Sequence, residues 1–156
     1  MIYEIHLYVP KTGRLTPLMM EWLFEYGLSD APEMYWPVRR VKPKSLARLL
    51  LAFDNALVPQ PGPGGDVELH HPDENLDLLL YIHDRGVIIF FPYMAYSVLS
   101  QIVVRIAYTY IRFLYDNGGF WSFDPQLNVI SYADDFQSID DTIALMDAIM
   151  PRLLTD

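Results

Sequence analysis

The chain has 156 residues, of which 52% are hydrophobic and 20% are charged, and its formal net charge is −9 at pH 7. This length suits a single domain built on one core, and the high apolar content excludes an intrinsically disordered chain. Cysteine is absent, which excludes disulfides, thiol catalysis and thiolate metal sites and fits a reducing compartment.

The N-terminal segment predicts a strand followed by a helix. Residues 2–9 alternate in polarity with the period of a β-strand, which places Tyr3, Ile5 and Leu7 on one face. Thr16 is a good N-cap and Pro17 is favoured at the first helical position, so we expect a helix to begin there and to end near residue 27. The segment does not have the pattern of a secretory leader, and a cytoplasmic location is therefore expected.

The next segment is basic and then amphipathic. Its positive charges are Arg39, Arg40, Lys42, Lys44 and Arg48. Because the whole chain is acidic, this small cluster does not favour nucleic-acid binding, and we expect it to pair with acidic C-terminal residues of the same or a second chain. Residues 38–41 are expected to form a short edge strand, and residues 45–57 a helix. The apolar stripe of that helix would consist of Leu46, Leu49, Leu50, Phe53 and Leu57.

A proline- and glycine-rich segment begins at Pro59 and ends at Gly65. It predicts a long surface loop. Its prolines lack the backbone donors that a phosphate-binding loop needs, so nucleotide binding is not indicated. The loop is nevertheless a candidate wall for a pocket on the sheet, and residues 67–71 after it predict a strand.

Residues 76–130 predict the centre of the fold. Two apolar runs, residues 78–83 and 87–91, flank a turn that ends at Gly86, which predicts a β-hairpin. We expect Gly86 to adopt a positive φ in this turn. The second run is apolar on both faces, which is typical of a central strand.

A long helix is predicted over residues 96–116. Its polar residues are spaced by three or four positions and form one narrow stripe, made of Ser97, Gln101, Arg105, Thr109, Arg112 and Asp116. The other faces need cover from the sheet and from a further helix, a loop or a partner subunit. The preceding hairpin and the polar residues of the stretch argue against a membrane span.

The C-terminal part of the chain is strongly acidic. Residues 116–156 carry one arginine and eight aspartates, a net charge of −7. Ser138 followed by Asp140 and Asp141 resembles a capping box and predicts a helix start. We expect Asp134, Asp135, Asp140 and Asp141 on the surface, where they either attract a basic partner or only solvate that face.

The expected elements alternate hairpins with helices along one domain, residues 1–156. This order predicts the α+β class, with a mixed or mainly antiparallel sheet, a central hairpin and a covering long helix.

No catalytic or cofactor motif is present in the sequence, which has no nucleophile elbow, no glycine-rich dinucleotide turn and no zinc-protease helix. The histidines are His6, His70, His71 and His83. Glu4 with His6, and Glu68 with His70, would each project from one strand face. A metal needs three or more converging ligands, so we expect neither a metal nor a cofactor.

One segment suggests a family. Residues 118–126 read Gly-Gly-Phe-Trp-Ser-Phe-Asp-Pro-Gln, in which Asp124 can accept backbone amide hydrogens and Pro125 fixes a turn. The segment resembles the helix, glycine, strand and (Tyr/Phe)-Asp-Pro-Gln arrangement of small bacterial α+β proteins, many of them uncharacterised. Some of these look like immunity proteins that neutralise secreted toxins. The resemblance implies a protein-binding role and transfers no catalytic residue.

Three functional hypotheses follow. The first is a cytoplasmic interaction module, an immunity or inhibitor protein that binds a basic partner through Asp124, the four aspartates above and Trp121 as an aromatic anchor. The second is a small enzyme or ligand-binding domain with a pocket near the segment from Pro59 to Gly65, in which His70 or His83 meets carboxylates. The third is a structural subunit of a homo-oligomer. The sequence favours a binding protein over an enzyme.

Overall fold

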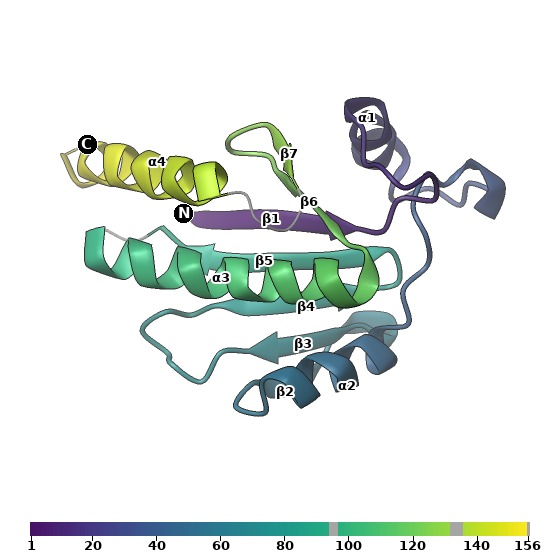
Figure 1. The fold of residues 1–156 in the computed structure, drawn as a ribbon, viewed down its shortest axis with the longest axis horizontal. Coiled ribbons are helices and arrows are strands. Elements are labelled where there is room, and N and C mark those ends of the chain that lie inside the picture. Colours follow the sequence, from purple (N-terminus) through teal and green to yellow (C-terminus); the bar gives the residue numbers. More distant parts are fainter. Residues whose placement is uncertain (94–96, 132–135, 156) are drawn as a thin grey trace.

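The computed structural model describes residues 1–93, 97–131 and 136–155. Within them the protein has an α+β fold with a seven-stranded antiparallel sheet in the order β2-β3-β4-β5-β1-β6-β7 (Figure 1). The strands are β1 (Ile2–Tyr8), β2 (Val58–Pro61), β3 (Val67–His70), β4 (Leu79–His83), β5 (Gly86–Pro92), β6 (Trp121–Asp124) and β7 (Val129–Ser131). The helices are α1 (Pro17–Tyr26), α2 (Pro43–Phe53), α3 (Ser97–Gly118) and α4 (Phe136–Thr155), with 3-10 turns η1 (Glu33–Tyr35) and η2 (Pro63–Gly65).

The two faces of the sheet build two separate cores. On one face, Tyr3, Ile5 and Leu7 of β1 are fully buried in the main core. Helices α2 and α3 cross this face, as Figure 1 shows. On the opposite face, Tyr8 of β1 and Phe123 of β6 pack in a smaller core under α1. The alternation predicted for β1 is therefore confirmed, and it is what divides the chain between the two cores.

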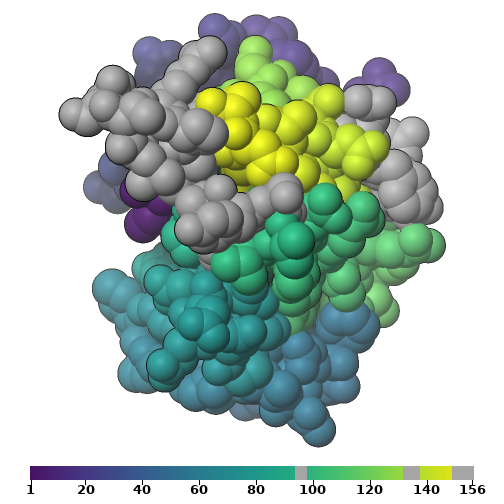
Figure 2. Space-filling model, turned by 90° about the vertical axis from the view of Figure 1, so that its left-hand side faces the viewer, coloured from purple at the N-terminus to yellow at the C-terminus, as the bar shows by residue number. Residues whose placement is uncertain are grey.

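Helix α3 exposes the predicted polar stripe and buries the opposite side. Gln101, Arg105, Thr109, Arg112 and Asp116 of the stripe are exposed, and the side chain of Ser97, the sixth residue, lies outside the described part of the structure. The buried residues include Val103, Val104, Ala107, Ile111 and Leu114. Helix α4 is the second element, besides the sheet, that covers α3, and Figure 2 shows it in yellow against the green of α3. Ser100 Oγ donates to Asp147 Oδ1 at 3.1 Å and ties the two helices together.

The central hairpin is confirmed, but the role of its glycine differs from the prediction. Strands β4 and β5 pair with His83 opposite Gly86, and β5 lies in the middle of the sheet. Gly86 does not have a positive φ. A Cβ at this position would meet the Leu7 carbonyl oxygen at 2.3 Å and the Tyr8 ring at 2.9 Å. Glycine is therefore required by close approach of the neighbouring strand β1 and not by the turn.

Only the first part of the predicted loop from Pro59 to Gly65 is an edge strand, because β2 ends at Pro61 and residues 62–65, with the 3-10 turn η2, connect it to β3. β2 pairs with β3 on one side only, with Pro59 opposite Leu69 and Pro61 opposite Val67. Proline tolerates this position because an outer edge needs no amide donor. Conversely, residues 38–41 form no strand, since only Val38 makes a β-bridge, to Pro10.

Two helix predictions need correction in their details. In α2, Leu50 is fully buried but Leu49 and Phe53 are 42% and 45% exposed, so the buried stripe is narrower than predicted. The capping box at Ser138 is wrong, because α4 already begins at Phe136 and Ser138 is buried inside it. Asp140 and Asp141 consequently lie beyond the first turn.

Arg40 of the basic cluster pairs with residues outside the acidic C-terminal part. Arg40 instead contacts Glu33 at 3.1 Å and Asp84 at 3.9 Å.

Among the described residues, no helix combines the length and the apolar character needed to cross a membrane.

Candidate functional site

Asp124, the first of the predicted binding residues, is a buried structural hub. It is 3% exposed, and its Oδ1 accepts the backbone N–H groups of Gln126 at 2.9 Å and Leu127 at 3.0 Å. Its Oδ2 accepts a hydrogen bond from the Tyr3 hydroxyl. The turn predicted from the Asp-Pro pair is thus confirmed. Because the carboxylate is enclosed, Asp124 cannot contribute to an acidic surface.

The other predicted residues do not converge on one site. Asp140 and Asp141 are exposed on α4, which covers the main core. Trp121 packs against the smaller core, on the opposite face of the sheet. Asp134 and Asp135 lie outside the described residues. The expected patch of aspartates around Trp121 is therefore not formed by the described residues.

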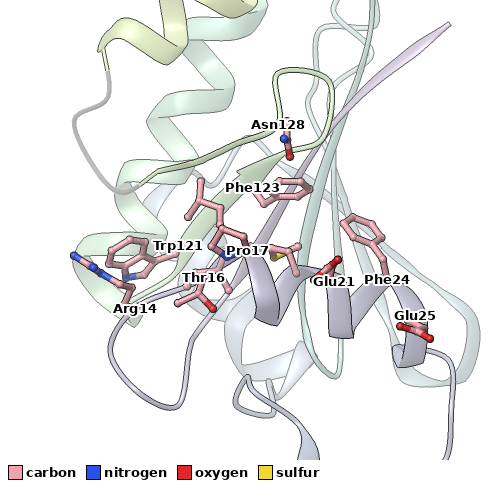
Figure 3. Close-up of a pocket in the computed structure, with 12 residues that line it drawn as sticks. Arg14, Thr16, Pro17, Glu21, Phe24, Glu25, Trp121, Phe123 and Asn128 are labelled. Carbon is pink, nitrogen blue, oxygen red and sulfur yellow. The ribbon is translucent and has the colours of Figure 1, made fainter.

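Trp121 instead lines a groove between α1 and the β6–β7 hairpin, which we call cleft A. The cleft holds about 1050 Å³, and Figure 3 shows Glu21 and Phe24 projecting from α1 towards the hairpin. Its apolar lining is supplied by Leu15, Pro17, Met20, Phe24, Trp121, Phe123 and Ile130. The charged residues on it are Arg14, Glu21 and Glu25. Glu21 and Glu25 make no hydrogen bond or ion pair within the described part of the chain.

Six large apolar side chains are exposed on α1 and the segment that follows it through η1. They are Leu18 at 75%, Phe24 at 57%, Tyr26 at 44%, Leu28 at 105%, Met34 at 80% and Tyr35 at 62%. Of the six, Phe24 lines cleft A and is the exposed apolar contact that the groove itself offers.

A second hollow, cleft B, lies on the same face of the sheet, between residues 27–31 after α1 and strands β1, β4 and β5. It holds about 800 Å³, and Phe24 lines both clefts. Its floor is a row of four rings, each with its centroid 6.4 Å from the next: His6, Tyr8, His83 and Tyr81. The Tyr8 ring can lie across β5 because Gly86 has no side chain there.

Histidine hydrogen bonding fixes the polar character of this floor. His83 Nδ1 accepts the Arg85 backbone N–H at 3.2 Å, so the neutral ring carries its hydrogen on Nε2. Burial lowers the pKa of His83, against the opposing effect of the Asp66 and Asp84 carboxylates, which keeps the ring neutral at pH 7.

The neutral His6 ring carries its hydrogen on Nε2 as well, but here Nε2 and not Nδ1 makes the hydrogen bond. Its Nε2 lies 3.2 Å from Glu4 Oε1, and because a carboxylate only accepts, Nε2 is the donor. In the neutral ring Nδ1 is then an acceptor, and this atom is buried without a hydrogen-bond partner among the described residues. The Tyr8 hydroxyl likewise makes no hydrogen bond within the described part of the chain.

The walls of cleft B are charged. The Tyr81 hydroxyl donates to Asp66 Oδ2 at 2.5 Å, and this bond raises the pKa of Tyr81 to about 12. Arg85 is buried, donates to both oxygens of Glu33 and lies 3.9 Å above the Trp36 ring. Hydrogen bonding by Arg85 is the main cause that lowers the pKa of Glu33 to about 2.

The sequence indicated only part of this site. His83 and Asp66 both line cleft B, whereas no residue of the segment from Pro59 to Gly65, where the pocket was expected, lines it. His70 does not line this cleft and pairs with Glu68 at 3.0 Å instead. Among the described residues, no group of three histidines or carboxylates is arranged to hold a metal ion. Tyr8 and Tyr81 carried no signal in the sequence, and His6 was indicated there only together with Glu4 as a pair of possible metal ligands.

Comparison with known proteins identifies no relative: no protein family, no curated protein and no solved structure matches the chain.

Proposed function

We propose that the protein is an interaction module that binds a segment of a partner protein in cleft A, and that this segment carries a lysine or arginine beside apolar residues. The observation that supports it best is that Glu21 and Glu25 lie on the rim of an apolar groove and have no ion-pair partner among the described residues. The two carboxylates are separated by four positions, so both face the groove from α1. When a lysine or arginine of the partner segment reaches these carboxylates, the apolar residues beside it can pack against Phe24 and Trp121.

Charge supports a basic partner. The chain has a net charge of −9, and opposite charge accelerates encounter between proteins. Asp140 and Asp141 are exposed and add to this long-range attraction, but they lie on α4 and not at the groove. The resemblance of the Asp124-Pro125-Gln126 segment to immunity proteins supports a toxin as the partner, and the absence of cysteine is compatible with the cytoplasm.

The test is selection from a displayed library of random peptides, followed by affinity measurement with the selected peptides. We expect enriched sequences to combine Lys or Arg with Leu, Phe or Trp. Glu21→Gln with Glu25→Gln should weaken their binding about tenfold or more, and added salt should slow their association.

The matched control is Asp140→Asn with Asp141→Asn, which removes the same two charges from α4. We expect it to change the association rate only slightly and the dissociation rate not at all. If this control, and not the α1 variant, abolishes binding, the partner uses the acidic surface of α4 and cleft A is not the site. If light scattering finds a dimer that Phe24→Ala disrupts, the groove is occupied by a second copy of the chain.

A further inference from the structure

We infer that cleft B is a separate binding site for a small planar aromatic amine. Three properties of the cleft lead to this class of ligand: its aromatic floor, its excess of negative charge and its unused hydrogen-bonding groups.

The floor fits a flat ring system. Four rings, His6, Tyr8, His83 and Tyr81, form a continuous row, and Phe24 meets His6 edge-on with centroids 5.6 Å apart. Such a row offers stacking and cation–π contacts over its whole length. The volume of about 800 Å³ lies in the range of small-molecule pockets.

The charges of the cleft favour a cation. Its two guanidinium groups, Arg40 and Arg85, are both held by Glu33, which also pairs with Lys11 at 3.5 Å. The lining carboxylates are Asp30, Asp66 and Asp84. The balance, three positive charges against four negative, is −1. An anionic ligand would be repelled, whereas an ammonium group gains a favourable interaction.

The unused polar groups fit an amine attached to a hydrogen-bonding ring. Asp66 is anchored through Oδ2 by the Tyr81 hydroxyl, which leaves Oδ1 as the acceptor for an ammonium group. His6 Nδ1 is a buried acceptor without a partner in the described part of the chain, and a ring N–H is a group that can satisfy it. The Tyr8 ring lies between the two histidine rings, and its hydroxyl also makes no hydrogen bond among the described residues.

Three indoles of nearly equal shape test the inference by calorimetry: tryptamine, which is cationic, indole-3-ethanol, which is neutral, and indole-3-acetate, which is anionic. We expect tryptamine to bind about tenfold or more tightly than the alcohol and the acetate not to bind measurably. The imidazole NMR signals of His6 and His83 should shift with tryptamine, and those of His70 and His71 should not.

Asp66→Asn should weaken tryptamine binding about tenfold and leave the alcohol unaffected, whereas Asp140→Asn, with the same change in net charge, should affect neither. Ser29→Trp, a substitution at an exposed position on the rim, should block all binding without altering the thermal melt.

Equal binding of the three indoles, preference for the acetate, or no imidazole shift at millimolar tryptamine would each overturn the inference. Glu21→Gln with Glu25→Gln should retain tryptamine binding, so a failure of cleft A as a docking site leaves this result intact.

Discussion

The side-chain amide of Gln126 pairs with the backbone of Glu4 as a strand residue would. Its Nε2 donates to the Glu4 carbonyl oxygen at 2.8 Å, and its Oε1 accepts the Glu4 N–H at 3.0 Å. β6 ends at Asp124, and the next residue, Pro125, has no N–H with which to continue the ladder. The glutamine amide therefore extends the β1–β6 pairing past the proline.

Gln126→Ala should destabilise the protein by about 1–3 kcal/mol, because it leaves a backbone donor and acceptor of Glu4 without partners. Urea unfolding measures the change. Gln126→Glu should be similarly destabilising, since a carboxylate cannot donate to the Glu4 carbonyl oxygen. Gln101→Ala, at an exposed position of α3, is the control and should change stability by less than about 0.5 kcal/mol. An unchanged urea midpoint for Gln126→Ala would mean that water replaces the amide at no cost.

The Tyr3 hydroxyl holds a buried carboxylate. Burial and the bond to Asp124 both raise the pKa of Tyr3, so the hydroxyl stays protonated and remains a donor over the ordinary pH range. Tyr3→Phe should cost about 1–3 kcal/mol, because Asp124 loses a donor where water has little access. Tyr35→Phe, on an exposed ring, is the matched control and should be neutral. Equal urea midpoints for the two variants would contradict this role of Tyr3.

The buried side of α3 anchors the main core. Ile111 is 1% exposed, whereas Val98, on the same helix, is 67% exposed. Ile111→Ala should destabilise the protein by about 2–5 kcal/mol through lost burial and a residual cavity. Val98→Ala should change stability by less than about 0.5 kcal/mol. Thermal and urea unfolding of the pair test the assignment, and comparable losses in both variants would show that the exposed side of α3 is also covered in solution.

Glu33 should make the stability of the protein depend on acid pH. Its pKa falls from 4.5 in an unfolded chain to about 2 in the folded protein, chiefly through hydrogen bonding by Arg85. A carboxylate with a lowered pKa stabilises the folded state above pH 4.5, and that contribution is lost as the pH falls towards 2. The urea midpoint of the wild-type protein should therefore be higher than that of Glu33→Gln at neutral pH. The difference should shrink through this window, and a difference independent of pH would show that the ion pair does not stabilise the fold.

The sequence by itself determined the features that depend on neighbouring residues. The alternation of residues 2–9, the Thr16-Pro17 helix start, the polar stripe of α3 and the turn at Asp124 all follow from local backbone preferences and side-chain periodicity. These preferences act over a few residues, so they can be read without knowledge of the rest of the chain. The α+β class followed from the order of such elements.

Only the tertiary structure decided which residues meet. Residues 59–61 became an edge strand because β3 offered them a partner on one side, and Gly86 is needed because the Leu7 carbonyl oxygen and the Tyr8 ring lie against it. Cleft B joins His6 to Asp66 and His83, which are far apart along the chain. Such contacts depend on strand order and register, since a shift of one residue would turn His6 and Tyr8 towards the main core. No local sequence pattern contains the strand order or the register, so neither cleft could be predicted without the assembled sheet.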